Sequence, residues 1–302
     1  MGGLREIAPG VHQLAVSIAN VYLVDGPGGT WRLIDTGVPD KGGEIRAAAE
    51  SHYGRGTRPA AIVLTHGHFD HSGSARELAE FWDVPIYAHQ LEMPFITGQS
   101  AYPPFDPTAG GFMAFVTRFL SPRDAFNLGG HLRGFGPGVD VLPGWEWFHT
   151  PGHSPGHVAY FRREDATLLA GDAFTTMNLD SLPAILQKKQ QVCRPPTPIN
   201  YDWQKARESV RLLSSLKPVT LACGHGIPMQ GENATHQLAM LARDFPIPRH
   251  GRYVRESALT NEHGIICLPP KPSDPLPKIA AGIGVAALAG TAAFFVTRKL
   301  RN

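Results

Sequence analysis

THGHFDHSG, residues 65–73, places three imidazoles and a carboxylate within six residues. The apolar run AIVL (61–64) precedes this stretch, and SARELAEFW (74–82), which has helical periodicity, follows it. The pattern predicts a strand, a ligand-bearing loop and a helix in that order. Imidazole and carboxylate groups are common ligands of zinc and of neighbouring first-row metals. The stretch therefore indicates a metal site, and the fold must bring the remaining ligands to it.

The spacing inside this loop favours two cations over one. His66 and His68 are two residues apart in a loop that leaves a strand, so their rings can turn to one side. Asp70 and His71 come round on the next turn and can face a second point. The alternative is a solvated loop that is rich in histidine by accident, and the other histidines of the chain must decide between the two interpretations.

A second histidine group lies in WEWFHTPGHSPGHVAYF (145–161), which predicts a strand, a turn and another strand. His149, His153 and His157 are four residues apart, but the Pro-Gly pairs between them exclude a helix, so the three rings cannot share a helical face. We expect one ligand, His153, presented by the turn, and two bystanders.

Two further strand ends carry a candidate ligand. TLLAGDAF (167–174) is an apolar strand that ends at Asp172. PVTLACGHG (218–226) ends at His225, where the flanking glycines free the backbone to bring the imidazole inward. Four separate strand ends therefore deliver His or Asp side chains, which favours a metal site over an accidental cluster.

The rest of the chain predicts strands that alternate with helices. Strands are expected at 11–26, in two antiparallel runs, at 30–37 and at 84–89, and helices at 41–54, 202–216 and 232–245. This alternation predicts an α/β protein in which helices pack outside a sheet. Asp35 ends the strand 30–37, where it could hold a ligand imidazole in one tautomer, but an Asp before Thr-Gly is also an ordinary turn residue. His89 is expected to be structural.

Residues 90–143 differ in composition, because Met, Phe, Tyr, Pro and Gly crowd the segment. Within it, GFMAFVTRFL (111–120) could form one short amphipathic helix. The segment lies between two sets of candidate ligands, so we expect a lid or a pocket wall for an apolar substrate group. The alternative is that these side chains only complete the core.

Composition excludes several classes of protein. The 302 residues are 42% hydrophobic, which is enough for a sizeable core, and 33 Gly and 27 Pro suit short strands and loops. The three cysteines have no C-x-x-C spacing, so neither a disulfide framework nor a cysteine metal motif is expected. Five of the 28 basic residues and one of the 26 acidic residues lie from Lys271 onward, which leaves the preceding part near neutral. We therefore expect no nucleic-acid partner. We expect the substrate to be a small molecule.

The C-terminal part differs from the rest. We expect the globular domain at 1–253 and a Pro-rich linker at 254–278. The 19 uncharged residues 279–297 would span roughly 28 Å as a helix, about the thickness of a bilayer core. We therefore expect a transmembrane helix that anchors the chain, with a cytoplasmic catalytic domain because no secretory signal begins the sequence. The alternative is a flexible Ala/Gly-rich tail. The sequence does not indicate an oligomeric state.

On these residues the chain resembles the metallo-β-lactamase superfamily of metal-dependent hydrolases, in particular its glyoxalase-II-like and lactonase-like branch. The motifs that carry the resemblance stand in the family's order and are IDTG (34–37), THGHFDH (65–71), TPGHSPGH (150–157), GD (171–172) and GHG (224–226). The resemblance covers about residues 8–250. It implies a four-layer αββα sandwich with the site at one edge, between two sheets.

The resemblance also implies a role for each candidate residue. His66, His68 and His153 would bind a first metal ion, and Asp70, His71 and His225 a second. Asp172 would bridge the two ions, and Asp35 would support the ligands from behind. The apolar tail is not part of the family's pattern. Asp172 argues against β-lactamase activity, because those enzymes typically place Cys or Ser at that point.

The expected activity is hydrolysis of an activated carbonyl, a thioester or a lactone, by water activated between two divalent ions. Zinc is the first expectation, and mixed nitrogen and oxygen ligation also accepts iron or manganese. Asp70 could orient the water and pass its proton to the leaving group. One alternative is a mononuclear iron dioxygenase acting on a thiol or persulfide, in which His68 and the second group would hold no metal. Others are a phosphodiesterase, which the lack of a basic surface disfavours, and a non-enzymatic scaffold, which the complete ligand set disfavours.

Overall fold

Strand β3 (Ala19–Asp25) shows how the sequence builds two cores at once. Its residues ANVYLVD are apolar on both faces, as in strands that are covered on both sides. Val21 and Leu23 point into one buried cluster, whereas Tyr22 and Val24 point into another. The first cluster also contains helical side chains, and the second contains side chains of another sheet.

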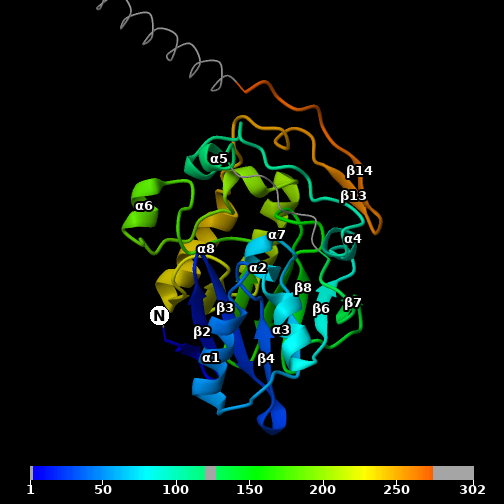
Figure 1. The fold of residues 1–302 in the computed structure, drawn as a ribbon. Coiled ribbons are helices and arrows are strands. Elements are labelled where there is room, and N and C mark those ends of the chain that lie inside the picture. Colours follow the sequence, from blue (N-terminus) through cyan, green and yellow to red (C-terminus); the bar gives the residue numbers. More distant parts are fainter. Residues whose placement is uncertain (1–2, 120–126, 275–302) are drawn as a thin grey trace, which may run out of the picture. The chain divides into compact units, whose positions relative to one another are not determined.

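The computed structural model describes residues 3–119 and 127–274, and the described chain forms two large sheets (Figure 1). The first sheet contains, in spatial order, β1 (Arg5–Ala8), β2 (Val11–Val16), β3, β4 (Trp31–Ile34), β5 (Ala61–Val63), β6 (Ile86–His89) and β7 (Leu132–Phe135). The second contains β12 (Met229–Gln230), β11 (Thr220–Cys223), β10 (Thr167–Gly171), β9 (Val158–Arg162) and β8 (Glu146–His149). Strands β4 to β7 are parallel, as are β10 and β11, and the other pairs are antiparallel.

Helices cover the outer face of each sheet. Helices α1 (Gly42–Tyr53) and α3 (Ala75–Trp82) lie on the first sheet, in front of it in Figure 1, and bury Ile45 and Leu78 there. Helices α7 (Trp203–Ser215) and α8 (Glu232–Arg243) bury Val210 and Leu238 against the second sheet. The layers therefore run helix, sheet, sheet, helix. The mixed α/β fold agrees with the sequence analysis, and all four helices begin and end within about two residues of the expected bounds.

Shorter elements fill the connections: η1 (Pro27–Gly29), α2 (Phe69–Ser72), α4 (Met93–Ile96), α5 (Phe112–Val116), α6 (Leu182–Leu186), η2 (Thr197–Ile199) and the hairpin of β13 (Leu259–Asn261) and β14 (Gly264–Cys267). The segment 90–143, expected to form a lid or pocket wall, contributes β7, the edge strand of the first sheet. The lid itself stays a prediction. Strand β7 pairs with residues 46 positions earlier, as in Ile86 with Leu132, and local periodicity does not reveal such a pairing.

The C-terminal hairpin changes the expected domain boundary. Strands β13 and β14 lie inside the segment 254–278 that the sequence analysis assigned to a linker, and the compact unit extends to Pro269 rather than ending at residue 253. The hairpin is tied to this unit because the Ile265 amide donates to Ser100 Oγ at 3.2 Å and the Ala258 amide donates to the Tyr201 carbonyl at 3.1 Å.

The expected transmembrane helix at 279–297 lies outside the described residues. Within residues 3–119 and 127–274, no helix has the length and apolar character needed to cross a membrane.

Candidate metal centre

The candidate ligands lie where loops leave the strands, at the edge where the two sheets meet. Asp35 follows β4 and the loop of His66 follows β5, and these two strands are parallel, so their carboxyl ends lie together. Asp172 and His225 likewise follow the parallel strands β10 and β11. Hydrogen bonds join the two sheets here, since the Val158 amide donates to the Thr65 carbonyl at 2.9 Å.

The structure brings the seven predicted ligands together as two groups of three residues, with Asp172 between the groups. The first group has one ligand atom each from His66, His68 and His153, within 4.8 Å of one another. The second group has one each from Asp70, His71 and His225, within the same limit. All six residues are buried.

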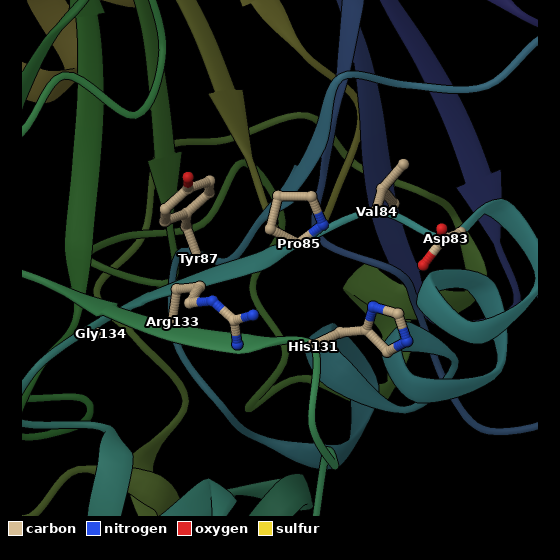
Figure 2. Close-up of a pocket in the computed structure, with 7 residues that line it drawn as sticks. All are labelled: Asp83, Val84, Pro85, Tyr87, His131, Arg133 and Gly134. Carbon is tan, nitrogen blue, oxygen red and sulfur yellow. The ribbon is translucent and has the colours of Figure 1, made fainter.

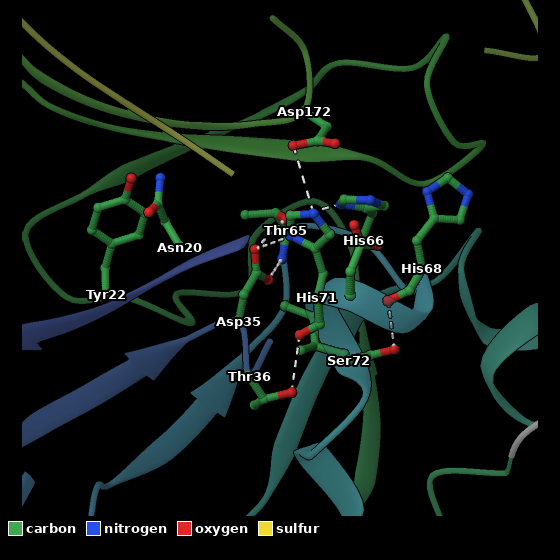
Figure 3. Close-up of polar contacts among 12 residues, drawn as sticks. Asn20, Tyr22, Asp35, Thr36, Thr65, His66, His68, His71, Ser72 and Asp172 are labelled. Atoms are coloured by element: carbon green, nitrogen blue, oxygen red, sulfur yellow. Dashed lines mark hydrogen bonds and ion pairs between the residues drawn. The ribbon is translucent and has the colours of Figure 1, made fainter. Parts of the chain in front are cut away.

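The carboxylate of Asp172 reaches both groups. Its Oδ2 lies 3.4 Å from Nε2 of His153 and 3.2 Å from Nε2 of His225. Its Oδ1 lies 3.6 Å from Nε2 of His71. Figure 3 shows Asp172 and Asp35 on opposite sides of the His71 ring. One carboxylate is therefore placed to contact ions held by either group.

Several atoms of these residues make no hydrogen bond. Nε2 of His66 is buried and has no hydrogen-bond partner within the described part of the chain, and neither have Nε2 of His71 and Oδ1 of Asp172, which lie 3.6 Å from each other. A buried polar atom without a partner costs about 1–3 kcal/mol, so such atoms usually serve another purpose. Their lone pairs would be satisfied by cations, and a set of imidazoles and carboxylates suits divalent first-row ions. The residues present therefore fit a metal centre.

Hydrogen bonds to Nδ1 of His71 and of His225 determine that Nε2 is the nitrogen available to a metal ion. Nδ1 of His71 donates to Asp35 Oδ2 at 2.8 Å, which leaves Nε2 free to bind metal. Asp35 is itself held, because its carboxylate accepts hydrogen bonds from the amide of Thr65 at 2.8 Å and from its hydroxyl at 2.7 Å. Nδ1 of His225 donates to the Ile18 carbonyl at 2.7 Å. These contacts are the ones that a ligand-orienting Asp35 requires, and that role stays a prediction.

The first group is electrostatically suited to a cation. Burial lowers the pKa of His68 to about 4, and it lowers the pKa values of His66 and His153 well below the ordinary value. These imidazoles are therefore neutral at pH 7, with lone pairs available to a metal.

The second group behaves differently because it contains carboxylates. Burial alone would lower the pKa of His225, but Asp172 and Asp70 raise it to about 10. The pKa of His71 is raised for the same reason. Burial would raise the pKa values of Asp70 and Asp172, yet the neighbouring imidazoles hold both below the usual range. The charges that stabilise these protons would equally stabilise a metal ion in their place.

The three histidines of segment 145–161 lie in different environments. Only His153 joins a ligand group. His157 accepts a hydrogen bond from the Asp172 amide at 2.9 Å, so it positions that residue, and burial lowers its pKa to about 3, which keeps it neutral. His149 stacks on His89 with the ring centres 4.6 Å apart, outside the ligand groups.

Sequence reasoning missed Glu92, a fully buried residue that joins the loops on either side of the ligands. Its Oε2 accepts hydrogen bonds from the Gly67 amide at 2.8 Å and from the Tyr102 hydroxyl. Its Oε1 accepts from Ser154 Oγ at 2.7 Å and from the Gly156 amide at 2.6 Å. Nothing in the residues around Glu92 indicates this role, because its partners are distant in the sequence.

A hollow of about 590 Å³ at the start of β6 and β7 lies apart from this centre (Figure 2). It is lined by Asp83, Val84, Pro85, Tyr87, His131, Arg133 and Gly134. No candidate ligand is among these residues, so the hollow takes no part in binding the metal ions.

Two buried groups of His and Asp at the strand ends of a layered α/β fold define a metal-dependent hydrolase of the metallo-β-lactamase type. The sequence profile of the Metallo-beta-lactamase superfamily matches residues 14–225. The chain therefore belongs to the metallo-β-lactamase superfamily, whose members bind divalent metal ions, as the resemblance implied.

Individual relatives agree with this assignment. The chain is 41% identical over 241 residues to the probable metallo-hydrolase YflN of Bacillus subtilis (strain 168), covering 78% of this chain and 91% of that one. It is 28% identical to the hydroxyacylglutathione hydrolase GloC of Haemophilus influenzae, covering 44% of this chain and 58% of that one. The crystal structure of TTHA1623 in a di-iron-bound form superposes with a TM-score of 0.51 at 29% identity, covering 76% and 96% of the two chains.

Proposed function

We propose that the chain is a binuclear hydrolase in which His66, His68 and His153 hold one divalent ion, and Asp70, His71 and His225 hold a second. The observation that supports this most directly is the position of Asp172, whose Oδ2 lies within 3.4 Å of a ligand nitrogen in each group. A mononuclear iron site would leave the second group, which Asp172 also contacts, without a purpose.

When bound, two such ions would lower the pKa of a water between them and polarise a substrate carbonyl. The chain supplies the proton transfer. In the metal-free chain His71 and His225 hold the pKa of Asp70 low, so its carboxylate is ionised at neutral pH. As an acceptor, this carboxylate can orient the water and pass its proton to the leaving group. Asp35 and His157 keep His71 and Asp172 in place during these steps.

The proposed substrate is a small molecule with an activated carbonyl, a thioester or a lactone. The similarity to a hydroxyacylglutathione hydrolase, which covers 44% of this chain, favours a thioester over a lactone as the substrate. We propose zinc as the metal. Iron is the alternative, because the similar structure of TTHA1623 is in a di-iron-bound form.

The proposal is tested by metal analysis of the purified protein, followed by hydrolysis assays on acyl thioesters, lactones and phosphodiesters. We expect two ions per chain and turnover of a thioester or lactone. His68→Ala and Asp172→Ala should abolish turnover while the circular dichroism spectrum is retained, whereas His236→Ala, an exposed change on α8, should leave the rate unchanged. Undiminished hydrolysis in either ligand variant, or a single bound iron, would contradict the proposal.

A further inference from the structure

A second cluster of metal-ligating side chains lies at the other end of the first sheet. His12 on β2, Asp25 at the end of β3 and His52 in the last turn of α1 each bring one ligand atom within 4.8 Å of the other two. Asn20, near the start of β3, contacts the loop of His225. Five residues of strand separate Asn20 from Asp25, which is about 17 Å, so the cluster is distinct from the candidate metal centre.

The distances in this cluster are close to those of a metal site. Nε2 of His12 lies 3.2 Å from Nε2 of His52 and 3.7 Å from Oδ2 of Asp25. Ligand atoms bound tetrahedrally to zinc at about 2.1 Å lie about 3.4 Å from one another. Small side-chain rotations would therefore bring all three atoms onto one ion, with water in the remaining position.

Neighbouring aromatic side chains fix the orientation of Asp25. The Tyr53 hydroxyl donates to Oδ1 of Asp25 at 2.5 Å, and Oδ2 is the oxygen nearer His12. Tyr53 is fixed in turn by stacking on Trp31, with the ring centres 4.8 Å apart. Contacts of this kind orient metal-ligating carboxylates. His52 also lies at the C-terminal end of a 12-residue helix, where the helix dipole favours a cation.

We propose that His12, Asp25 and His52 form a separate zinc site that ties β2, β3 and α1 together. His12 is only 7% exposed and provides a fixed ligand, whereas Asp25 and His52 are exposed, so the ion can enter from solvent. Two imidazoles and one carboxylate suit Zn²⁺ better than the hard cations Mg²⁺ and Ca²⁺, which prefer oxygen. The competing explanation is a direct hydrogen bond between the two imidazoles, which requires a proton on one Nε2 and binds no metal.

The experiment compares the zinc content of the full chain with that of His52→Ala after equilibrium dialysis against micromolar Zn²⁺. We expect one zinc ion fewer per chain in His52→Ala and an unchanged rate of hydrolysis. We also expect the rise in melting temperature that added Zn²⁺ produces in the full chain to be smaller in this variant. Because the readout is a difference, it does not depend on how many ions the candidate centre holds.

Asp25→Asn provides a second, nearly isosteric variant that retains an oxygen to accept the Tyr53 hydrogen bond. It should bind the additional zinc more weakly, and His236→Ala should match the full chain in both measurements. Equal zinc content in the full chain, His52→Ala and Asp25→Asn would overturn the proposal and would leave the imidazole hydrogen bond as the explanation.

Discussion

Glu92 illustrates how a single buried residue can determine the geometry of a site without touching the reacting atoms. Its four hydrogen-bond donors belong to the loop of His68, the loop of His153 and Tyr102, whose ring centre lies 4.7 Å from that of His68. All four partners present a hydrogen to the carboxylate, so the ionised form matches them. Burial disfavours the ionised carboxylate and raises the pKa of Glu92, whereas the four hydrogen bonds stabilise the ionised form.

We predict that Glu92→Gln weakens both the fold and the retention of metal. The amide nitrogen of a glutamine donates hydrogen bonds, so it would face at least one donor of Gly67 or Gly156 with no acceptor. An unsatisfied buried donor costs about 1–3 kcal/mol, and the free energy of unfolding should fall by that amount. Chemical denaturation and the rate of metal loss to a chelator measure the two effects. The exposed Glu208→Gln on α7 is the control, and equal stability of the two variants would contradict the role assigned to Glu92.

At the scale of elements, the site depends on which strand ends meet. Periodicity alone predicted α7 at 202–216, and the helix spans Trp203–Ser215, because Asp202 caps its first turn by accepting from the Gln204 and Lys205 amides. The ligand-bearing loops could also be predicted, because His and Asp residues stand next to glycines at the ends of apolar runs. Strand β7 and the β13–β14 hairpin could not, because each is short, partly exposed and defined by pairing with a distant segment.

The two ligand-bearing regions should respond to metal removal and pH in different ways. A ligating imidazole must be neutral, so metal entering the group of His71 and His225 displaces protons, whereas metal entering the group of His68 does not at neutral pH. Affinity of the second group should therefore rise with pH. Titration calorimetry in buffers of different ionisation enthalpy should detect proton release for one ion only. Equal release for both ions, or for neither, would show that the carboxylates do not set these pKa values.

The metal-free protein should show a linked effect on stability. The pKa of His225 is about 10 in the fold against an ordinary value of 6.5, so the ion pairs with Asp70 and Asp172 stabilise the fold fully below pH 6.5. That contribution is lost as pH rises through about 10. The melting temperature of chelator-treated protein should therefore decline across this range more steeply than that of metal-loaded protein. Parallel curves would contradict the prediction.

At the scale of the whole molecule, the catalytic unit includes the hairpin and ends at Pro269. The segment beyond Tyr253 contributes Ala258, which is 3% exposed and belongs to the core under α7 and α8. The Arg252 guanidinium also donates to the Pro269 carbonyl at 2.8 Å, which fastens the end of the unit. A boundary at residue 253 was expected because a Pro-rich composition is visible in a sequence, whereas a half-exposed hairpin is not.

Two truncations separate these interpretations. A chain ending at Pro270 keeps the hairpin and the contacts of Ala258 and Pro269, so it should retain the metal content, turnover and melting temperature of the full chain. A chain ending at Tyr253 loses the hairpin and the Ala258 contact, and it should melt at a lower temperature. If residues 279–297 form the membrane anchor that their composition predicts, only the full chain should float with phospholipid vesicles. Loss of turnover in the chain ending at Pro270 would instead show that the tail belongs to the catalytic unit. Equal melting temperatures of the two truncated chains would show that the hairpin does not belong to that unit.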